Sequence, residues 1–442
     1  MPLAQASAAG ETIVALSSGQ GRAAIAVIRI SGPAARQASM ILLRQEPINR
    51  QARLAVFRPV GETQPTDRCI ALFFEGPASA TGEDLLELHV HGGLAVIDAV
   101  LTSLVEALPR TRLAEPGEFT RRSLENGKLG LLQVEALGDV LAAETRAQLT
   151  QAQRQMAGEM TAMVADWRNR ILDMRALIEA DLDFADEGDV GDALVEQVCS
   201  LAGSLYRDVS QMLGDAQRGQ RIRDGARIVV IGAPNAGKSS LINAMTGRDV
   251  SIVSDQPGTT RDVIEAPMVI AGWSVILQDT AGIRESDDLI EQEGVRRALQ
   301  KIDAADIIIS LGAWDVPRLP QEPASAHVRL IDVTTKADVA PPVDGSLGVS
   351  SKTGKGIAEL RERCSIILNE MLSGDPPLIA RERHRQALGQ CARALFDASE
   401  GRLPELIAED LRRANGALAR LVGAEDIDNV LDRLFAGFCI GK

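Results

Sequence analysis

Short apolar runs alternate with polar loops over the first 120 residues of the chain. Runs of this length predict strands, and apolar residues spaced by three and four between them predict helices. The predicted strands are residues 25–30, 53–60, 68–74 and 85–90, and the predicted helices are residues 33–43 and 93–107. Strands that alternate with helices indicate an α/β or α+β domain over residues 1–120.

From residue 121 to residue 218 the apolar positions recur only at helical spacing. The clearest stripe predicts one long amphipathic helix and contains Met156, Met160, Met163, Trp167, Ile171, Met174 and Ile178. A second predicted helix carries Val198, Leu205, Val209 and Leu213. Residues 375–442 return to this spacing, with one face formed by Ile407, Leu411, Leu418 and Leu421. Such stripes, methionine-rich ones included, are typical of the core of a helical bundle.

A phosphate-binding signature lies between the two helical segments. Residues 226–231 are an apolar run typical of a buried parallel strand, and residues 232–239 (G-A-P-N-A-G-K-S) fit the pattern G-x-x-x-x-G-K-S/T. Residues 240–245 open a helix, so backbone N–H groups can turn toward a phosphate at its N-terminus. Lys238 is expected to reach the outer phosphates, and the Ser239 hydroxyl is expected to hold Mg²⁺.

Four further motifs follow in the order typical of a Ras-like GTPase. They are residues 258–262 (G-T-T-R-D), 279–282 (D-T-A-G), 335–338 (T-K-A-D) and 350–352 (S-S-K), with strands predicted at 275–277, 307–311 and 329–333. Hydroxyls of the first motif can complete the Mg²⁺ shell, Asp279 suits a carboxylate behind it, and Gly282 can sense a γ-phosphate.

The third motif selects the base. The Asp338 carboxylate can accept N1–H and N2–H of guanine but would repel N1 of adenine, which favours GTP over ATP. Residues 350–352 resemble a loop that offers a backbone N–H to guanine O6. Thr335 stands where Asn is usual, so a carboxamide contact to the base and to the phosphate loop is expected to be missing.

Hydrolysis needs a positioned water and a positive charge near the transferred phosphate. Ile283 occupies the position of the Ras-like Gln, and no arginine is clearly placed for the charge, although Arg261 and Arg284 lie in switch-like segments. These groups must come from another side chain, a monovalent cation or a partner. Asn235 and residues 254–256 (S-D-Q) could coordinate a cation; alternatively, Asn235 is merely compatible with the loop.

The changes of pattern predict an α/β multidomain chain. A nucleotide domain of residues 219–374 is inserted into an all-helical domain made of residues 121–218 and 375–442, behind the N-terminal domain of residues 1–120. Insertion requires that the ends of the inserted domain lie close together, as they do in Ras-like folds. A string of five separate domains is the alternative.

Composition limits the partners. The net charge of −14 argues against nonspecific coating of nucleic acid, and 3% aromatic residues argue against a base-stacking platform. An RNA substrate therefore needs a local patch or a partner protein. No apolar run approaches ~20 residues, and the first residues lack a signal-peptide pattern. Five scattered cysteines are typical of reduced thiols, so we expect a cytoplasmic protein with no membrane partner.

Three smaller clusters have two interpretations each. His89 and His91 share one face of a strand, but two ligands alone favour a strand end before a Gly turn over a metal site. Residues 116–122 and Lys128 form a basic turn that is either solvated or faces an anion. Residues 438–442 (F-C-I-G-K) are unusually apolar for a chain end, which normally frays.

The whole chain resembles the MnmE (TrmE) family of bacterial tRNA modification GTPases, of the TrmE-Era-EngA-YihA-Septin-like group. Besides the GTPase motifs, the matching segments are residues 11–15 (E-T-I-V-A), 27–32 (V-I-R-I-S-G), 81–93 (T-G-E-D-L-L-E-L-H-V-H-G-G), 116–120 (P-G-E-F-T), 126–129 (N-G-K-L) and 439–442 (C-I-G-K). A terminal C-x-G-K behind an inserted GTPase domain is a specific signature. The resemblance implies that residues 1–120 bind tetrahydrofolate and dimerise.

By the family's pattern, a homodimer acts on tRNA with an FAD-dependent partner, MnmG, in a heterotetramer. The product implied is carboxymethylaminomethyl- or aminomethyl-uridine at the wobble position, with a one-carbon unit from a formyl or methylene tetrahydrofolate. The folate contacts map onto Arg29, Glu87, Lys128 and Lys442. Folate has an anionic glutamate tail and pterin N–H groups, so the basic turn and the unusual C-terminus both gain a function.

The resemblance also implies K⁺ in place of an arginine finger, with ligands at Asn235, Ser254, Gln256 and Thr259. It assigns Mg²⁺ to Ser239 and Thr260, and the positioning of water to Glu291. Cys439 is a candidate nucleophile or redox thiol in uridine chemistry, with packing as the alternative. The residues expected around GTP are Asn235, Ala236, Gly237, Lys238, Ser239, Ser240, Ser254, Asp255, Gln256, Pro257, Gly258, Thr259, Thr260, Asp279, Thr280, Ala281, Gly282, Thr335, Lys336, Ala337, Asp338, Ser350, Ser351 and Lys352.

Two other functions use parts of this pattern. A ribosome-assembly or signalling GTPase would need the same motifs as a switch, but would not need the N-terminal domain or the terminal thiol. A folate-dependent transferase acting on a small molecule would need no GTPase motifs. Folate binding, together with wobble-uridine modification that depends on this chain, would separate these possibilities.

Overall fold

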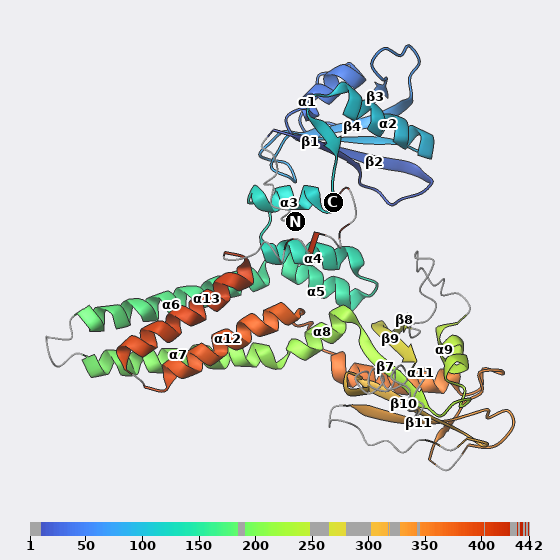
Figure 1. Cartoon of the computed structure of the whole chain (residues 1–442), viewed down its shortest axis with the longest axis vertical. Helices are drawn as coiled ribbons and strands as arrows, with labels where there is room; N and C mark the ends of the chain where they lie inside the picture. The colour runs from blue at the N-terminus through green and yellow to red at the C-terminus, as the bar shows by residue number, and fades with distance from the viewer. Residues whose placement is uncertain are drawn as a thin grey trace, which may run out of the picture. The chain divides into compact units, whose positions relative to one another are not determined.

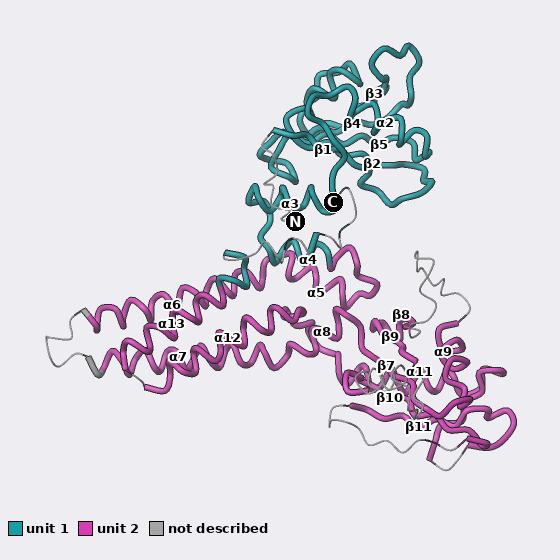
Figure 2. Tube along the Cα trace, in the orientation of Figure 1, with its two compact units in different colours: residues 1–138, 419–442 teal, residues 139–418 magenta. Residues whose placement is uncertain are grey.

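The computed structural model (Figure 1) describes residues 10–183, 191–247, 265–279, 302–316, 328–342, 345–401 and 403–424, together with residues 318, 431, 434, 435, 438 and 441. The chain divides into two compact units, coloured separately in Figure 2. The first contains residues 1–138 and 419–442, and the second contains residues 139–418. Each unit holds a six-stranded sheet and helices, so the α/β multidomain prediction is confirmed.

The sheet of the first unit has the order β3-β4-β5-β2-β1-β6, and β6 runs parallel to β1 while the other pairs are antiparallel. Its strands are β1 (Thr12–Leu16), β2 (Ala23–Ser31), β3 (Arg53–Phe57), β4 (Asp67–Phe74), β5 (Leu85–Gly92) and β6 (Thr111–Leu113). The four predicted strands are present. The hydrophobic pattern does not indicate β1 or β6, because such short strands show too few alternations.

Buried and more exposed side chains alternate along β2, and this pattern shows which face of the sheet packs against the core. Ala26, Ile28 and Ile30 are buried with residues of the covering helices α1 (Ala35–Ala38), η1 (Ser39–Leu43) and α2 (Leu94–Ala107). Because side chains alternate between faces, Arg29 points to the opposite face, where it lies directly across from Glu87 of β5. This second face therefore carries the side chains of Arg29 and Glu87.

One helix, the part of a second helix up to Gly138, and the end of the chain complete the first unit. Phe119 of α3 (Glu118–Glu125) packs in a cluster with Ile13 and Leu85. Leu131, at the start of α4 (Leu131–Ala142), is buried with Phe435 of the C-terminal segment. The C-terminal segment therefore packs into the same unit as the N-terminal sheet.

The predicted methionine stripe is divided between two helices of the second unit. α5 ends at Met156, and Gly158, whose φ is +85°, separates it from α6, so one continuous helix is wrong. Of the other six residues of the stripe, five are buried along α6, as predicted (Met160, Trp167, Ile171, Met174 and Ile178), and Met163 is half-buried. The bounds are α5 (Arg146–Met156), α6 (Glu159–Asp183), α7 (Gly191–Gly214), α8 (Ala216–Asp224), α12 (Glu382–Ser399) and α13 (Pro404–Val422). α6, α7 and α12 lie side by side (Figure 1).

The sheet of the second unit has the order β12-β11-β10-β7-β9-β8 and is parallel except for β8. The strands are β7 (Ala226–Gly232), β8 (Glu265–Ile270), β9 (Trp273–Asp279), β10 (Ile307–Ala313), β11 (Arg329–Thr335) and β12 (Leu347–Gly348). α9 (Lys238–Thr246) and α11 (Ile357–Leu372) pack on it. The phosphate loop, Asp279 and the motifs of residues 335–338 and 350–352 thus follow the carboxyl ends of parallel strands, where α/β proteins bind ligands.

The structure also shows whether its helices could span a membrane and where four of the five cysteines lie. No helix in the described part of the chain is long and apolar enough to cross a membrane. Cys69, Cys199, Cys364 and Cys391 are free thiols, and burial raises the pKa of Cys364 and Cys391 to about 12. These two thiols are therefore inert packing residues at neutral pH.

Candidate functional site

The phosphate loop connects β7 to α9. Asn235 and Gly237 both adopt left-handed backbone conformations, with φ of +64° and +92°. Asn is one of the few residues other than Gly that tolerates this region, which explains its place in the loop. Lys238 Nζ donates to the carbonyl oxygens of Gly232 and Ala233 at 2.8 and 3.1 Å. The ammonium group therefore lies over the loop at the N-terminus of α9.

Electrostatics around Lys238 favour an anion. Burial lowers the pKa of Lys238, and the charge of Asp279 partly offsets this effect. A phosphate bound at the loop would restore the preference for the charged form, because an opposite charge nearby favours it. The positive end of the α9 dipole acts in the same direction.

Ser239 and Asp279 form the beginning of a cation site. The Ser239 hydroxyl donates to Asp279 Oδ2 at 2.9 Å, and Asp279 is 1% exposed at the end of β9. Asp279 Oδ1 is buried and has no hydrogen-bond partner among the described residues. A hydroxyl and a carboxylate with an unused oxygen are the donors that Mg²⁺ takes, so these two residues fit the ion.

Thr335 corrects one expectation. Its hydroxyl donates to the carbonyl oxygen of Ala236 at 2.7 Å and also lies 3.2 Å from that of Gly312. The link between the base-binding loop and the phosphate loop is therefore kept by a hydroxyl in place of the usual carboxamide. Thr335 is 5% exposed, so the link is shielded from water.

The base-binding end is formed by loops after β11 and β12. Asp338 is exposed, and hydrogen bonding to the Ser350 side chain lowers its pKa, as does the charge of Lys352. The Lys336 ammonium instead pairs with Asp315 at 2.8 Å. At neutral pH Asp338 is thus an ionised acceptor that faces solvent, as guanine recognition requires.

One open cavity of about 1510 Å³ joins these loops. Of the expected GTP residues it is lined by Asn235, Gly237, Lys238, Ser239, Ser240, Thr335, Lys336, Asp338, Ser350, Ser351 and Lys352. Ala236 and Ala337 are buried beside it, and Asp279 is reached through Ser239. Asn243 and Ile357 also line it, and the sequence signal for Asn243 is its helical spacing of four from Ser239.

Several expected residues lie outside the described residues. They are Ser254, Asp255, Gln256, Pro257, Gly258, Thr259, Thr260, Thr280, Ala281, Gly282 and Glu291 in the second unit, and Cys439 and Lys442 at the C-terminus.

The first unit brings two of the expected folate residues together. Arg29 Nε lies 2.8 Å from Glu87 Oε1, and their side chains are 32% and 13% exposed. His89 Nε2 lies 3.6 Å from Glu87 Oε2 and is buried without a hydrogen-bond partner among the described residues. Glu87 therefore sits between two nitrogen groups and keeps lone pairs available to a ligand.

The end of the chain lies at the same strands. Ser17 Oγ donates to the carbonyl oxygen of Gly441 at 2.8 Å, and the Ser17 N–H donates to Val27, two residues before Arg29. Gly441 has φ of +96°, and an added Cβ would lie 2.2 Å from the carbonyl oxygen of Leu16. Glycine is therefore required where the C-terminus meets β1. At its described positions, the C-terminal segment packs instead of fraying.

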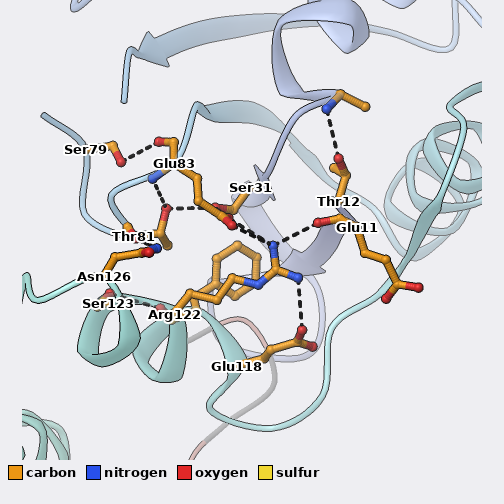
Figure 3. Close-up of polar contacts among 12 residues, drawn as sticks. Glu11, Thr12, Ser31, Ser79, Thr81, Glu83, Glu118, Arg122, Ser123 and Asn126 are labelled. Carbon is orange, nitrogen blue, oxygen red and sulfur yellow. Dashed lines mark hydrogen bonds and ion pairs between the residues drawn. The ribbon is translucent and has the colours of Figure 1, made fainter. Parts of the chain in front are cut away.

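The basic turn is largely neutralised. Arg122 is 3% exposed and pairs with Glu83 and Glu118 at 2.9 and 3.1 Å (Figure 3). Arg121 pairs with Glu125 on the same helix. Lys128 is exposed just after α3. Of these three cations, Lys128 is the one placed to meet a solvent-borne anion.

The two histidines lie near the end of β5, the arrangement that the sequence favours. β5 ends at Gly92 and α2 follows, as predicted. His91 Nδ1 lies 2.7 Å from Asp67 Oδ1, where the two side chains pair across the sheet. The described residues contain no group of three or more side chains that could hold a metal ion.

Comparison with known proteins covers nearly the whole chain. Residues 131–439 match the family model of the MnmE helical domain, and residues 12–128 match that of the GTP-binding protein TrmE N-terminus. The tRNA modification GTPase MnmE of Azorhizobium caulinodans is 46% identical over 98% of this chain and 99% of its own. The protein of the same name from Parvibaculum lavamentivorans is also 46% identical, over 98% and 100%. The mitochondrial 5-taurinomethyluridine tRNA synthase subunit GTPB3 of Homo sapiens is 42% identical over 99% and 95%.

Proposed function

Because the chain belongs to the MnmE family of tRNA modification GTPases, we propose that it couples K⁺-dependent GTP hydrolysis to folate-dependent modification of the wobble uridine. The products are carboxymethylaminomethyl- and aminomethyl-uridine, formed on tRNA with an FAD-dependent MnmG-like partner. The observation that carries the proposal is that one chain holds both a guanine-nucleotide cavity and an Arg29–Glu87 pair beside an anchored C-terminus.

In the nucleotide cavity, Lys238 and the backbone N–H groups of the phosphate loop bind the β- and γ-phosphates. Ser239 and Thr260 would hold Mg²⁺, with Asp279 behind Ser239; when bound, the ion neutralises phosphate charge. Asn235, Ser254, Gln256 and Thr259 would hold K⁺, which supplies the positive charge that an arginine supplies elsewhere. Glu291 positions the water, and Asp338 selects guanine.

The first unit binds a formyl or methylene tetrahydrofolate. Glu87 accepts pterin N–H groups, while Arg29 fixes the position of the carboxylate. Lys128 and Lys442 meet anionic groups of the cofactor. The bond from Ser17 to Gly441 supports this assignment, because it holds the residue before Lys442 at the strand next to Arg29. Cys439, three residues earlier, is a candidate for the chemistry on uridine.

Residues 1–120 also form the homodimer contact, and residues 219–374 work as a nucleotide domain inserted between helical residues 121–218 and 375–442. The sheet face that carries Arg29 exposes Ile25, Leu54 and Ile70, which are 59%, 67% and 45% accessible. Three large apolar side chains on one face of the sheet, from β2, β3 and β4, are typical of a surface that another subunit covers. The chain acts on tRNA through its partner, because its own net charge is −14.

The cation is tested by GTPase turnover in equal concentrations of KCl and NaCl. We expect a severalfold higher rate in KCl, and loss of this difference in Asn235→Gly, which removes the carboxamide but tolerates the left-handed backbone, with GTP binding retained. Equal rates for the wild-type chain would overturn the K⁺ assignment.

The cofactor is tested by equilibrium dialysis of 5-formyltetrahydrofolate. Binding should be lost in Glu87→Ala and retained in Glu62→Ala, a control that removes an exposed carboxylate from a turn. In a bacterial host that lacks its own family member, mass spectrometry of tRNA nucleosides should show wobble modification restored by the wild-type chain and not by Glu87→Ala. Restoration by Glu87→Ala would refute the folate step.

A further inference from the structure

The chain enters and leaves the nucleotide fold at neighbouring places. The entry is α8 and the exit is residues 373–381, between α11 and α12; together they are called the stem. Gly219 of α8 lies against the exit so closely that an added Cβ would sit 1.9 Å from the carbonyl oxygen of Ile379. The two halves of the stem are therefore in direct backbone contact, which only glycine permits at this position.

Side chains from one face of α5 bind the stem. Gln148 donates to the carbonyl of Arg223 in the entry, and Arg154 and Gln155 donate to the carbonyls of Pro376 and Leu378 in the exit. Gln151 Nε2 donates to both halves, to Gly219 at 3.1 Å and to Pro377 at 2.8 Å. The spacing of three and four residues puts Gln148, Gln151 and Gln155 on one helical face.

These bonds satisfy groups that have few other partners. Pro376 and Pro377 interrupt regular structure, so the carbonyls around them need donors from elsewhere. Gln151 and Gln155 are each 3% exposed, so water does not compete for these bonds. Sliding one half of the stem past the other would break a bond at Gln151 and leave a buried polar group unpaired.

Asp139 adds a second connection from α4. Its Oδ1 accepts from Arg223 Nε at 2.9 Å and from Arg381 Nη2 at 2.7 Å, one in each half of the stem. Arg218 of the entry also donates to the carbonyls of Ser373 and Asp375 in the exit. Three independent sets of contacts thus hold entry and exit together and to the helices.

We propose that α5 and Asp139 hold the stem as one rigid joint. This joint transmits movement of the nucleotide fold during the GTP cycle to the helices of the second unit. Two flexible linkers would absorb such movement, whereas a joint bound at both halves transmits it as displacement of α5. Gln151 is the central positioning residue. The inference rests on the coupling of GTP hydrolysis to tRNA modification, and it holds whichever cation or cofactor is used.

The test is Gln151→Glu in the full chain. This change keeps the size of the side chain but replaces two N–H donors with a carboxylate facing two carbonyl oxygens. The phosphate loop begins at the other end of β7, about 20 Å away for a strand of this length. We therefore expect GTPase turnover within about twofold of wild type, at least tenfold less wobble modification in the complemented host, and faster amide exchange in α8.

Gln153→Glu is the matched control, because it makes the same chemical change at an exposed position of the same helix. It should match wild type in all three measurements. If Gln151→Glu does not fold, Arg154→Met, which removes a partly exposed contact to the exit, is measured by the same criteria and should show the same pattern more weakly.

The outcomes separate cleanly. Retained GTPase with lost modification and faster α8 exchange supports the joint. Normal modification despite faster exchange overturns it, because the connection then carries no signal. A GTPase rate that falls in proportion to modification also overturns it, because the stem would then act on the nucleotide cavity alone.

Discussion

The substitution Arg122→Met should loosen the first unit strongly, because Arg122 is a buried cation with three partners, two carboxylates and one backbone carbonyl. It pairs with Glu83 and Glu118 and donates to the carbonyl of Glu11 at 3.0 Å. Removing one member of a buried pair leaves uncompensated charge and costs about 3–5 kcal/mol. Glu118 keeps two bonds from Arg112, and Glu83 is 28% exposed, so we expect the lower end, about 3 kcal/mol.

Amide exchange in α3 measures this effect. The three tryptophans, Trp167, Trp273 and Trp314, all lie in the second unit, so tryptophan fluorescence does not report unfolding of the first. A loss of about 3 kcal/mol corresponds to exchange roughly a hundredfold faster where opening limits exchange. Arg121→Met is the control, since its pair with Glu125 is largely solvated and worth under about 1 kcal/mol. Equal exchange in the two variants would refute the reasoning.

The same network predicts a pH dependence. Burial raises the pKa of Glu118, but hydrogen bonds from Arg112 and the Glu115 N–H, with the charges of Arg112 and Arg122, lower it below the ordinary 4.5. A carboxylate with a lowered folded pKa stabilises the fold above its unfolded pKa and loses this contribution as pH falls through the folded value. α3 of the wild-type chain should therefore keep its protection to a lower pH than α3 of Arg122→Met.

Three further substitutions have defined outcomes. Thr335→Val removes the hydroxyl that donates to the carbonyls of Ala236 and Gly312. Because a lost buried hydrogen bond costs about 1–1.5 kcal/mol, GTP affinity measured with a fluorescent analogue should fall about tenfold. Unchanged affinity would show that the link is dispensable. Asp338→Asn exchanges an acceptor for a donor, so competition binding should shift from GTP toward xanthosine triphosphate, and an unshifted preference would exclude Asp338 from the base. Gly441→Ala places a Cβ against Leu16, so folate binding should weaken while GTPase turnover stays normal; normal folate binding would contradict a role for the anchored terminus.

Local patterns predict the nucleotide fold well because its signals are local. The run from β7 to α9 contains a buried strand, a glycine-rich loop and a helix start within 21 residues of sequence, from Ala226 to Thr246. Asp338 follows β11, a strand that the hydrophobic pattern predicts, whereas the two-residue β12 before Ser350 is too short to be predicted. The role of Thr335 is different, because its hydroxyl bonds Ala236, which is 99 residues away in sequence. No local pattern reports that contact.

The limits of prediction are clearest at α5. Helical spacing continues through Met156 into α6, so the pattern cannot locate the break that Gly158 introduces. The glutamines of α5 suggest a solvent-facing surface, yet Gln151 and Gln155 are buried because they bind carbonyls that are distant in sequence, two of them more than 200 residues away. Burial of a polar side chain depends on such partners, and a single sequence does not reveal which distant residues will become its partners.

Charge placement is consistent with an acidic chain that binds the anionic ligands proposed for it. At each candidate site the cations are few and held by geometry: Lys238 lies over the phosphate loop, and Arg29 is fixed by Glu87. Arg121 and Arg122 belong to the basic turn by sequence, but both form ion pairs within the chain. With a net charge of −14, the chain has no general attraction for a polyanion, so under the proposed function we expect most of the cations that hold tRNA on the proposed partner. The salt dependence of tRNA binding should accordingly follow substitutions in the partner more than those in this chain.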